Sequence, residues 1–458
     1  MPTSARLKFD INDVVGPSAG DAALKDAESV LKRVVQATRA VDDRYVAGQI
    51  LYLNLPANTA AREAIIALSQ ELRRDYDTLV VLGNGGGIRG AQAITGALLN
   101  PFHNLRASNQ RDGMRIFYAD SADAKTFSSL IELLDPPRTA FVVASISGEG
   151  EEALALVSVV RGLLQGQIGI EAVRQQIVAV VGEGTNPLST IAKAEGWRTL
   201  VVPSGIPDAF TTFSAIGLLP AACAGVDLTA LLAGASAMIE RGFLPRLEND
   251  SPASAFAALH HAMGRPVHLL VPYADALVPA VDWFVALWSA ALNKANAESP
   301  IALRMSGTSQ QDAALQVMLD GASNKLVTFL TLEETWGDVA VPPVYPDVPE
   351  ASALGRVTLS RLTDIEQRAA TFALIARKRP NTNIILPKLD AYHLGELLMM
   401  FQMTTSIAGE LYGADVAHAP APGAQKRYVS ALLGRPGSED AAAEIASMPP
   451  RAPDLVLS

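Results

Sequence analysis

Short apolar runs recur along the chain, separated by segments of helix length in which polar residues alternate with apolar ones. The runs lie at 78–83, 115–120, 140–147, 176–182, 198–204, 266–273, 299–305, 325–332, 356–362 and 383–389. Runs rich in valine and isoleucine and bounded by Gly, Pro or Ser are typical of buried strands in parallel sheets. The pattern therefore predicts an α/β fold with two doubly wound parallel sheets.

The two series of runs also predict the domain organisation. A length of 458 residues exceeds the size at which one hydrophobic core stops growing, which favours two domains. The stretch between the two series is polar and carries proline, so the boundary is expected there. The predicted divisions are a helical N-terminal arm at 1–75, a first domain at 76–240, a second domain at 262–405, and a C-terminal helix and tail at 406–458.

Composition and charge narrow the class of protein. Hydrophobic residues make up 49% and charged residues 18%, which is typical of a globular chain. The net charge of −10 argues against nucleic acid or an anionic membrane as a partner. The single cysteine, Cys223, excludes an intramolecular disulfide and is expected to be buried. With no recognisable leader and no uninterrupted apolar span, we expect a cytoplasmic protein.

Two glycine-rich turns follow predicted strands of the first series: GNGGGIRG at 83–90 and SISGEGEEA at 145–153. Such turns expose backbone N–H groups at a helix N-terminus, which suits an anion. Arg89 lies where a dinucleotide fold needs close packing, and no acidic residue follows at the spacing of that fold, so a dinucleotide site is not favoured. The alternative for the first turn is a tight turn that binds no ligand. Because both turns lie at the carboxyl edge of one sheet, together they predict a binding site.

These turns, followed by the segments at 204–235 and 393–437, resemble glucose-6-phosphate isomerase of the bacterial type, which has two sugar-isomerase (SIS) domains. The resemblance runs from about residue 75 to residue 437. It implies an aldose–ketose isomerisation in which a carboxylate moves a proton between neighbouring carbons through an enediol. It also implies a ring-opening histidine from the second subunit of a dimer, an arginine that offsets negative charge, and a loop that holds the phosphate.

The positions that match this catalytic group carry other residues. Ala290 stands where the resemblance places the glutamate base, and alanine cannot move a proton. Asp312 replaces the histidine, and Ala209 replaces the arginine. Glu149 replaces the first threonine of the phosphate loop, where a carboxylate would repel a phosphate. Only Lys426 is retained.

The other candidate site residues are interpreted from their residue types and from the resemblance. Asp312 is interpreted as a solvated carboxylate, with a new catalytic acid as the alternative, and His418 as a surface residue, with a catalytic role as the alternative. Arg89 is a candidate partner for Glu149, and such a pair would close the pocket internally. The expected ligand-contacting residues are Gly85, Gly86, Gly87, Arg89, Ser145, Ser147, Glu149 and Asp208. We expect no metal site and no cofactor.

The leading hypothesis is therefore a catalytically inactive or strongly impaired member of this family, retained as a carbohydrate-binding or assembly protein and forming a homodimer. The alternative is an active isomerase, either the ordinary one for glucose 6-phosphate and fructose 6-phosphate or one with a non-phosphorylated substrate. The expected ligand is a small sugar or sugar derivative. A mixed dimer with an active paralogue is a second assembly consistent with the shared site.

Overall fold

The computed structural model describes residues 6–16, 27–243, 251–292, 298–416 and 423–451. The chain forms two compact units, Met1–Ala417 and His418–Ser458. The first unit holds two five-stranded sheets, and the second holds the helices α17 (Gly423–Leu432) and α18 (Glu439–Ser447). Within the second unit, Arg427 and Tyr428 of α17 both bind the carboxylate of Glu444 in α18.

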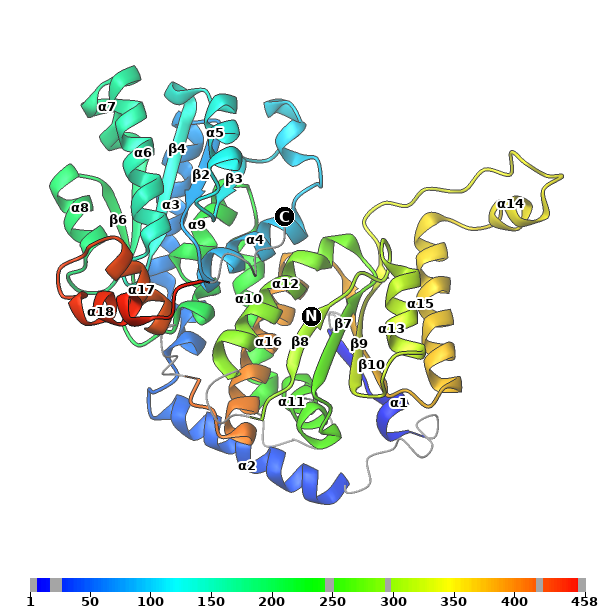
Figure 1. Ribbon diagram of the computed structural model, residues 1–458. Helices are drawn as coiled ribbons and strands as arrows, with labels where there is room; N and C mark the ends of the chain where they lie inside the picture. Colours follow the sequence, from blue (N-terminus) through cyan, green and yellow to red (C-terminus); the bar gives the residue numbers. More distant parts are fainter. Residues whose placement is uncertain (1–5, 17–26, 244–250, 293–297, 417–422, 452–458) are drawn as a thin grey trace. The chain divides into compact units, whose positions relative to one another are not determined.

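The first sheet has the strand order β3-β2-β4-β5-β6 and is parallel throughout (Figure 1). Its strands are β2 (Thr78–Leu82), β3 (Arg115–Ala119), β4 (Thr139–Ser145), β5 (Ile177–Gly182) and β6 (Arg198–Val202). Alternate strand residues pack into two clusters, one against α3, α4 and α9 and the other against α5 to α8. These helices are α3 (Thr59–Asp75), α4 (Gly86–Leu98), α5 (Ala124–Leu133), α6 (Glu151–Ile168), α7 (Ile170–Gln176), α8 (Pro187–Glu195) and α9 (Ala215–Cys223).

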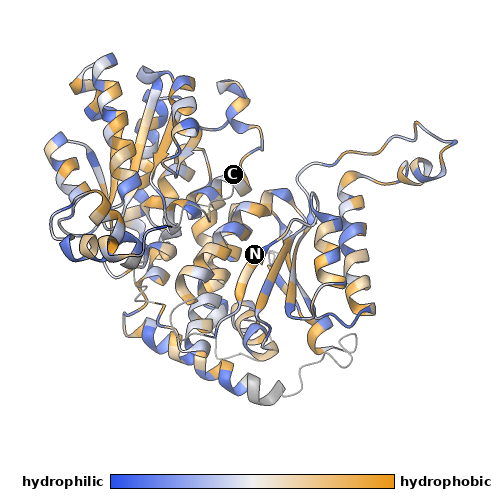
Figure 2. Cartoon of the chain, viewed as in Figure 1, coloured by the Kyte–Doolittle hydropathy of each residue, from blue (hydrophilic) through white to orange (hydrophobic). Residues whose placement is uncertain are grey.

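The second sheet has the order β1-β10-β9-β7-β8, in which only the edge strand β1 is antiparallel. Its strands are β1 (Lys8–Asp10), β7 (Val267–Pro272), β8 (Ile301–Arg304), β9 (Lys325–Glu334) and β10 (Asn381–Lys388). One face packs against α11 (Pro252–Met263), α12 (Val278–Leu292) and α16 (Ala391–Tyr412), and the other against α13 (Gln311–Leu319) and α15 (Leu359–Ala376). The strands of both sheets are largely apolar in Figure 2, as buried parallel strands require.

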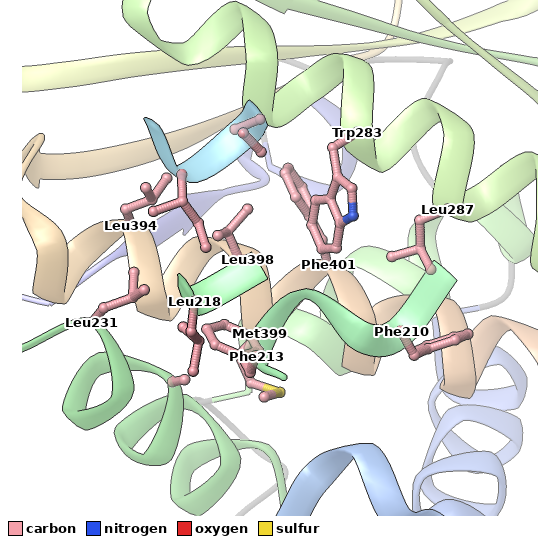
Figure 3. Close-up of a cluster of buried hydrophobic side chains, with 14 of the residues drawn as sticks. Phe210, Phe213, Leu218, Leu231, Trp283, Leu287, Leu394, Leu398, Met399 and Phe401 are labelled. Atoms are coloured by element: carbon pink, nitrogen blue, oxygen red, sulfur yellow. The ribbon is translucent and has the colours of Figure 1, made fainter. Parts of the chain in front are cut away.

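One hydrophobic cluster joins the two sheets through α4, α10 (Leu228–Phe243), α12 and α16. Phe284 of α12 stacks on Phe401 of α16 with ring centroids 4.1 Å apart, and Figure 3 shows Trp283 beside Phe401 in this cluster. The segment Asp275–Leu292 is long and apolar enough to cross a membrane, but half of it is buried within the unit. Cys223 is buried as predicted, and burial raises the pKa of its thiol to about 12.

The remaining elements complete the described chain. The remaining helices are α1 (Asn12–Val15), α2 (Ala27–Val46) and α14 (Pro349–Leu354), and the 3₁₀ turns are η2 (Leu51–Ala57), η3 (His103–Leu105), η4 (Ser108–Gln110), η5 (Pro136–Arg138), η6 (Asp208–Phe213) and η7 (Asp275–Leu277). Of these, η6 lies against the N-terminal part of α4 and positions the candidate site.

The structure corrects three sequence-based predictions. The run at 356–362 is not a strand: Thr358 forms an isolated bridge with Ala340, and its side chain then caps α15 by accepting the N–H of Arg361. The arm at 1–75 is not wholly helical, because Lys8–Asp10 adds a strand to the second sheet. The predicted boundary between 405 and 406 falls inside α16, which is buried along most of its length.

Candidate functional site

The first glycine-rich turn packs tightly against η6. Gly83 and Gly85 adopt φ values of +127° and +113°, which favour glycine. A Cβ atom on Gly86 would lie 2.4 Å from the Cα of Ala209, and one on Gly90 would lie 2.3 Å from the Oγ1 of Thr212. Close approach of α4 to η6 therefore accounts for much of the glycine in this turn.

Asp208, the first residue of η6, binds the N-terminus of α4. Its Oδ2 accepts the N–H of Gly86 at 2.6 Å. The positive end of a helix dipole and its unpaired N–H groups favour an anion at this place. Here that anion is a carboxylate of the chain itself, supplied from 122 residues along the sequence.

The second turn uses its hydroxyl groups internally. Ser145 Oγ accepts the N–H of Gly148 at 3.1 Å, and Ser147 Oγ accepts the N–H of Glu149 at 3.3 Å. Gly148 has a φ of +67°, and a Cβ there would lie 2.1 Å from Asn186 Oδ1. The turn thus keeps the shape of an anion cup, with two of its backbone donors already bonded.

Carboxylates surround the N-terminus of α6. Glu149 is exposed, and Glu151 and Glu152 lie in the first turn of the helix. The candidate pair of Arg89 and Glu149 is not formed: both side chains are exposed, and no ion pair among the described residues joins them. A dianion approaching α6 would meet the negative charge of these carboxylates.

Neither alanine at the replaced positions has a group that can titrate. Ala290 is exposed near the end of α12. Leu287, one turn earlier, is buried on the helix that contacts η6, which carries Phe210 (Figure 3). Ala209 is half-buried against Gly86. The places where the resemblance puts the base and the arginine therefore carry methyl groups.

The other predicted residues lie elsewhere. Asp312 is exposed in the first turn of α13, which packs on the opposite face of the second sheet from α12 and α16. Lys426 is half-buried in α17 of the second unit. His418 lies outside the described residues. The first unit alone therefore assembles Gly85, Gly86, Gly87 and Asp208 in one place, with Asp312 on another face.

Two carboxylates at the same sheet edge were not predicted. Asp120, just after β3, accepts the side-chain amide of Gln92 at 2.9 Å. Glu183, just after β5, accepts the N–H of Ser204 at 3.1 Å, and hydrogen bonds from Ser204 lower the pKa of this carboxyl. The signal that identifies them is position alone, since each directly follows a predicted strand.

Buried histidines form a second polar feature that the sequence analysis missed. His260 of α11 and His268 of β7 have ring centroids 3.4 Å apart and are 2% and 0% exposed. Burial lowers the pKa of His260 to about 3 and holds the pKa of His268 well below its usual range. Within the described ranges, no group of three or more His, Cys, Asp or Glu side chains is arranged to hold a metal ion.

The sequence of the chain is similar to those of known glucose-6-phosphate isomerases. A scan against protein-family models finds no match. The chain is 34% identical over 391 residues to the glucose-6-phosphate isomerase of Rubrobacter xylanophilus, covering 84% of this chain and 89% of that protein. It is 29% identical over 454 residues to that of Carboxydothermus hydrogenoformans, covering 96% and 97%.

Solved structures agree on the fold. A hypothetical protein from Thermus thermophilus matches with a TM-score of 0.81 and 27% identity, covering 93% of this chain and 99% of that one. A glucose-6-phosphate isomerase from Chlamydia trachomatis matches with a TM-score of 0.72 and 19% identity, covering 87% and 81%. The two parallel sheets found here are thus the architecture of sugar-isomerase structures.

Proposed function

The chain belongs to the glucose-6-phosphate isomerase family, and we propose that it is a member without isomerase catalysis, retained as a carbohydrate-binding or assembly protein. The observation that carries this proposal is the hydrogen bond from Gly86 N–H to Asp208 at 2.6 Å. It places a fixed negative charge beside the position of the lost arginine. An enediolate forming there would be repelled by this charge instead of stabilised.

The proton-transfer step lacks its base. Moving a proton between neighbouring carbons needs a group that accepts and returns it within hydrogen-bond reach of the substrate. Ala290 offers only a methyl group at the exposed end of α12. Asp312 does not replace it within one chain, because α13 lies on the other face of the second sheet.

Substrate anchoring is weakened as well. The turn before α6 matches the phosphate loop of the family in position, but it carries Glu149, and the first turn of α6 adds Glu151 and Glu152. Charge repulsion there disfavours a phosphorylated sugar more than a neutral one. Retained carbohydrate binding is therefore expected for sugars without a phosphate group.

The test is a coupled assay of glucose 6-phosphate conversion by the purified chain, with an active relative as the positive control. We expect no turnover above the buffer blank, and none from Ala290→Glu alone, because the arginine and phosphate loop are also changed. Turnover by the unaltered chain that Lys426→Ala abolishes would contradict the proposal. That result would support an ordinary isomerase instead.

A second candidate function is action on a neutral or amino sugar. The observation that favours it is the series of carboxylates at the carboxyl edge of the first sheet: Asp120, Glu149, Glu183 and Asp208. Such an edge attracts cationic ligands and tolerates neutral ones. Glucosamine should raise the melting temperature while glucose 6-phosphate should not; the reverse order would argue against this candidate.

The assembly is proposed to be a homodimer. The segment between β9 and α15 extends away from the second sheet with α14 (Figure 1). It exposes large apolar side chains, namely Trp336, Val339, Val344, Tyr345 and Val348. Exposed apolar groups gathered on one segment favour burial against a partner. Light scattering of the purified chain should give twice the mass of one chain, and Trp336→Ser should lower the measured mass. In a mixed dimer with an active paralogue, the paralogue should lose its activity.

A further inference from the structure

A hollow of about 190 Å³ lies at the opposite end of η6 from Asp208. It is bounded by η2, by the first turns of α3, by the edge strand β6, and by α9 and α10. Among the described residues, none of the catalytic or ligand-contacting positions expected from the sequence lines it. The hollow is therefore separate from the candidate sugar site, although both share η6.

Most of the wall of this hollow is apolar. Its largest apolar side chains are those of Leu55, Ile65, Phe213, Leu218 and Leu232, and all five are buried. Of the residues that the structure describes, no aspartate or glutamate lines it. A ligand that fills it must bring an apolar body, because water inside would leave this surface unfavourably hydrated.

Two polar side chains of the hollow, those of Arg62 and Ser214, carry unused donors. Arg62 is half-buried, and its guanidinium has neither an ion pair nor a hydrogen bond in the described parts of the chain. Ser214 is 3% exposed; its Oγ accepts the N–H of Ile216 at 3.3 Å, and its own proton has no acceptor among the described residues. A buried donor without an acceptor is costly, so it points to a ligand that accepts.

The backbone around the hollow adds to the positive potential. Asn58 is the N-cap of α3, accepting the N–H of Ala61 at 3.0 Å, and Ser214 is the N-cap of α9. Both helices therefore direct their positive ends toward the space beside Arg62. The side-chain amide of Asn58 donates no hydrogen bond within the described chain, which supplies one more donor.

We propose that this hollow binds a small carboxylate with a branched apolar body. The carboxylate lies between Arg62 and Ser214, where it accepts charge-assisted hydrogen bonds. The alkyl body lies against Phe213, Leu218 and Leu232. The inference concerns a site other than the sugar site, and it holds whether or not the chain catalyses isomerisation.

The first experiment is calorimetry and thermal denaturation of the full chain with 4-methylpentanoate as the probe. The matched control ligand is 4-methylpentanamide, which has the same shape and no charge. We expect the carboxylate to bind and to raise the melting temperature, and the amide to bind about tenfold more weakly or worse. No binding of the carboxylate up to about 10 mM, or equal affinity for both ligands, overturns the proposal.

Three variants localise the binding. Arg62→Met keeps the alkyl stem and removes the charge, and should weaken carboxylate binding about tenfold. Arg106→Met, at an exposed arginine outside the hollow, should leave it unchanged. Thr199→Phe fills the hollow from the exposed edge strand β6 and should abolish binding. Binding that survives both Arg62→Met and Thr199→Phe places the ligand elsewhere and contradicts the inference.

Discussion

The turn before α4 and the turn before α6 follow neighbouring buried strands of one sheet, and both are rich in glycine, yet they pack differently. In the first, Cβ atoms on Gly86 and Gly90 would overlap with η6. In the second, a Cβ atom on Gly150 would meet its nearest neighbour, Ser145 Oγ, at 3.5 Å, an ordinary contact. The first turn is fixed by packing at several glycines. In the second, Gly148 is packed against Asn186, but the turn is open at Gly150.

If catalysis is lost as proposed, this difference explains how the fold can persist while residues of the site change. Glycines that touch another backbone cannot be replaced without moving it, so the α4 turn remains specified by the core. Glu149 and Ala290 lie on exposed positions, where substitution costs little stability. Glu149 and Ala290 are thus at positions that packing does not hold in place, whereas Ala209 lies in the packed contact between η6 and α4.

The largest expected difference in stability between the two turns is the one between Gly90→Ala and Gly150→Ala. Gly90→Ala forces a Cβ atom into Thr212 Oγ1 and should lower the free energy of unfolding by about 2–3 kcal/mol. Gly150→Ala should lower it by less than about 1 kcal/mol. Urea denaturation followed by circular dichroism measures both. Equal losses would show that the two turns are packed alike.

The dependence of stability on pH distinguishes the buried His260 from the exposed carboxylate of Glu149. His260 is neutral in the fold, with its pKa lowered by burial to about 3, whereas an unfolded histidine titrates near 6.5. The unfolded state therefore binds more protons as the pH falls below about 6.5, and the free energy of unfolding decreases. The loss at pH 5 should be on the order of 2 kcal/mol for this histidine.

The matched variants are His260→Leu and Glu149→Gln. His260→Leu should flatten the dependence of the unfolding free energy on pH between about 6.5 and 5. Glu149→Gln, at the open turn, should leave that part of the profile unchanged. A profile insensitive to His260→Leu would mean that the histidine is not held neutral by burial.

The smallest expected difference in the free energy of unfolding is the one between Asp208→Ala and Glu149→Ala. Asp208 satisfies the N–H of Gly86 at a helix N-terminus, so its removal should lower the free energy of unfolding by about 1 kcal/mol. Glu149→Ala should change it by no more than about 0.5 kcal/mol. Thermal denaturation at pH 7 resolves the two, and a larger loss for Glu149→Ala would reverse the assignment of packed and open turns.

Much of the fold follows from the sequence. Nine of the ten apolar runs form strands, because burial on both faces leaves a continuous apolar signature. The run at 356–362 failed because Thr358 acts as a helix cap, and β1 was missed because Lys8–Asp10 is short and charged. These elements depend on local hydrogen bonds and on pairing at a sheet edge, and the pattern of hydrophobic residues predicts neither.

The sequence predicted that the two turns lie at one edge of the sheet, but not the contacts that they make. The two turns and their edge of the sheet follow from strand order, yet the bond between Gly86 and Asp208 joins residues 122 positions apart. The candidate pair of Arg89 and Glu149 is not formed, since proximity in the sheet does not set side-chain direction. His268 was missed because a polar residue in an apolar run reads as part of the strand.

Exchange of substrate hydrogen with solvent tests the central claim most directly, because it reports proton transfer even when net conversion is slow. Glucose 6-phosphate is incubated with the chain in D₂O, and deuterium at C2 is followed by proton NMR, with an active relative as control. With Ala290 in place of a base, we predict no deuterium incorporation above the buffer blank. Incorporation by the unaltered chain that Lys426→Ala removes would contradict the loss of catalysis.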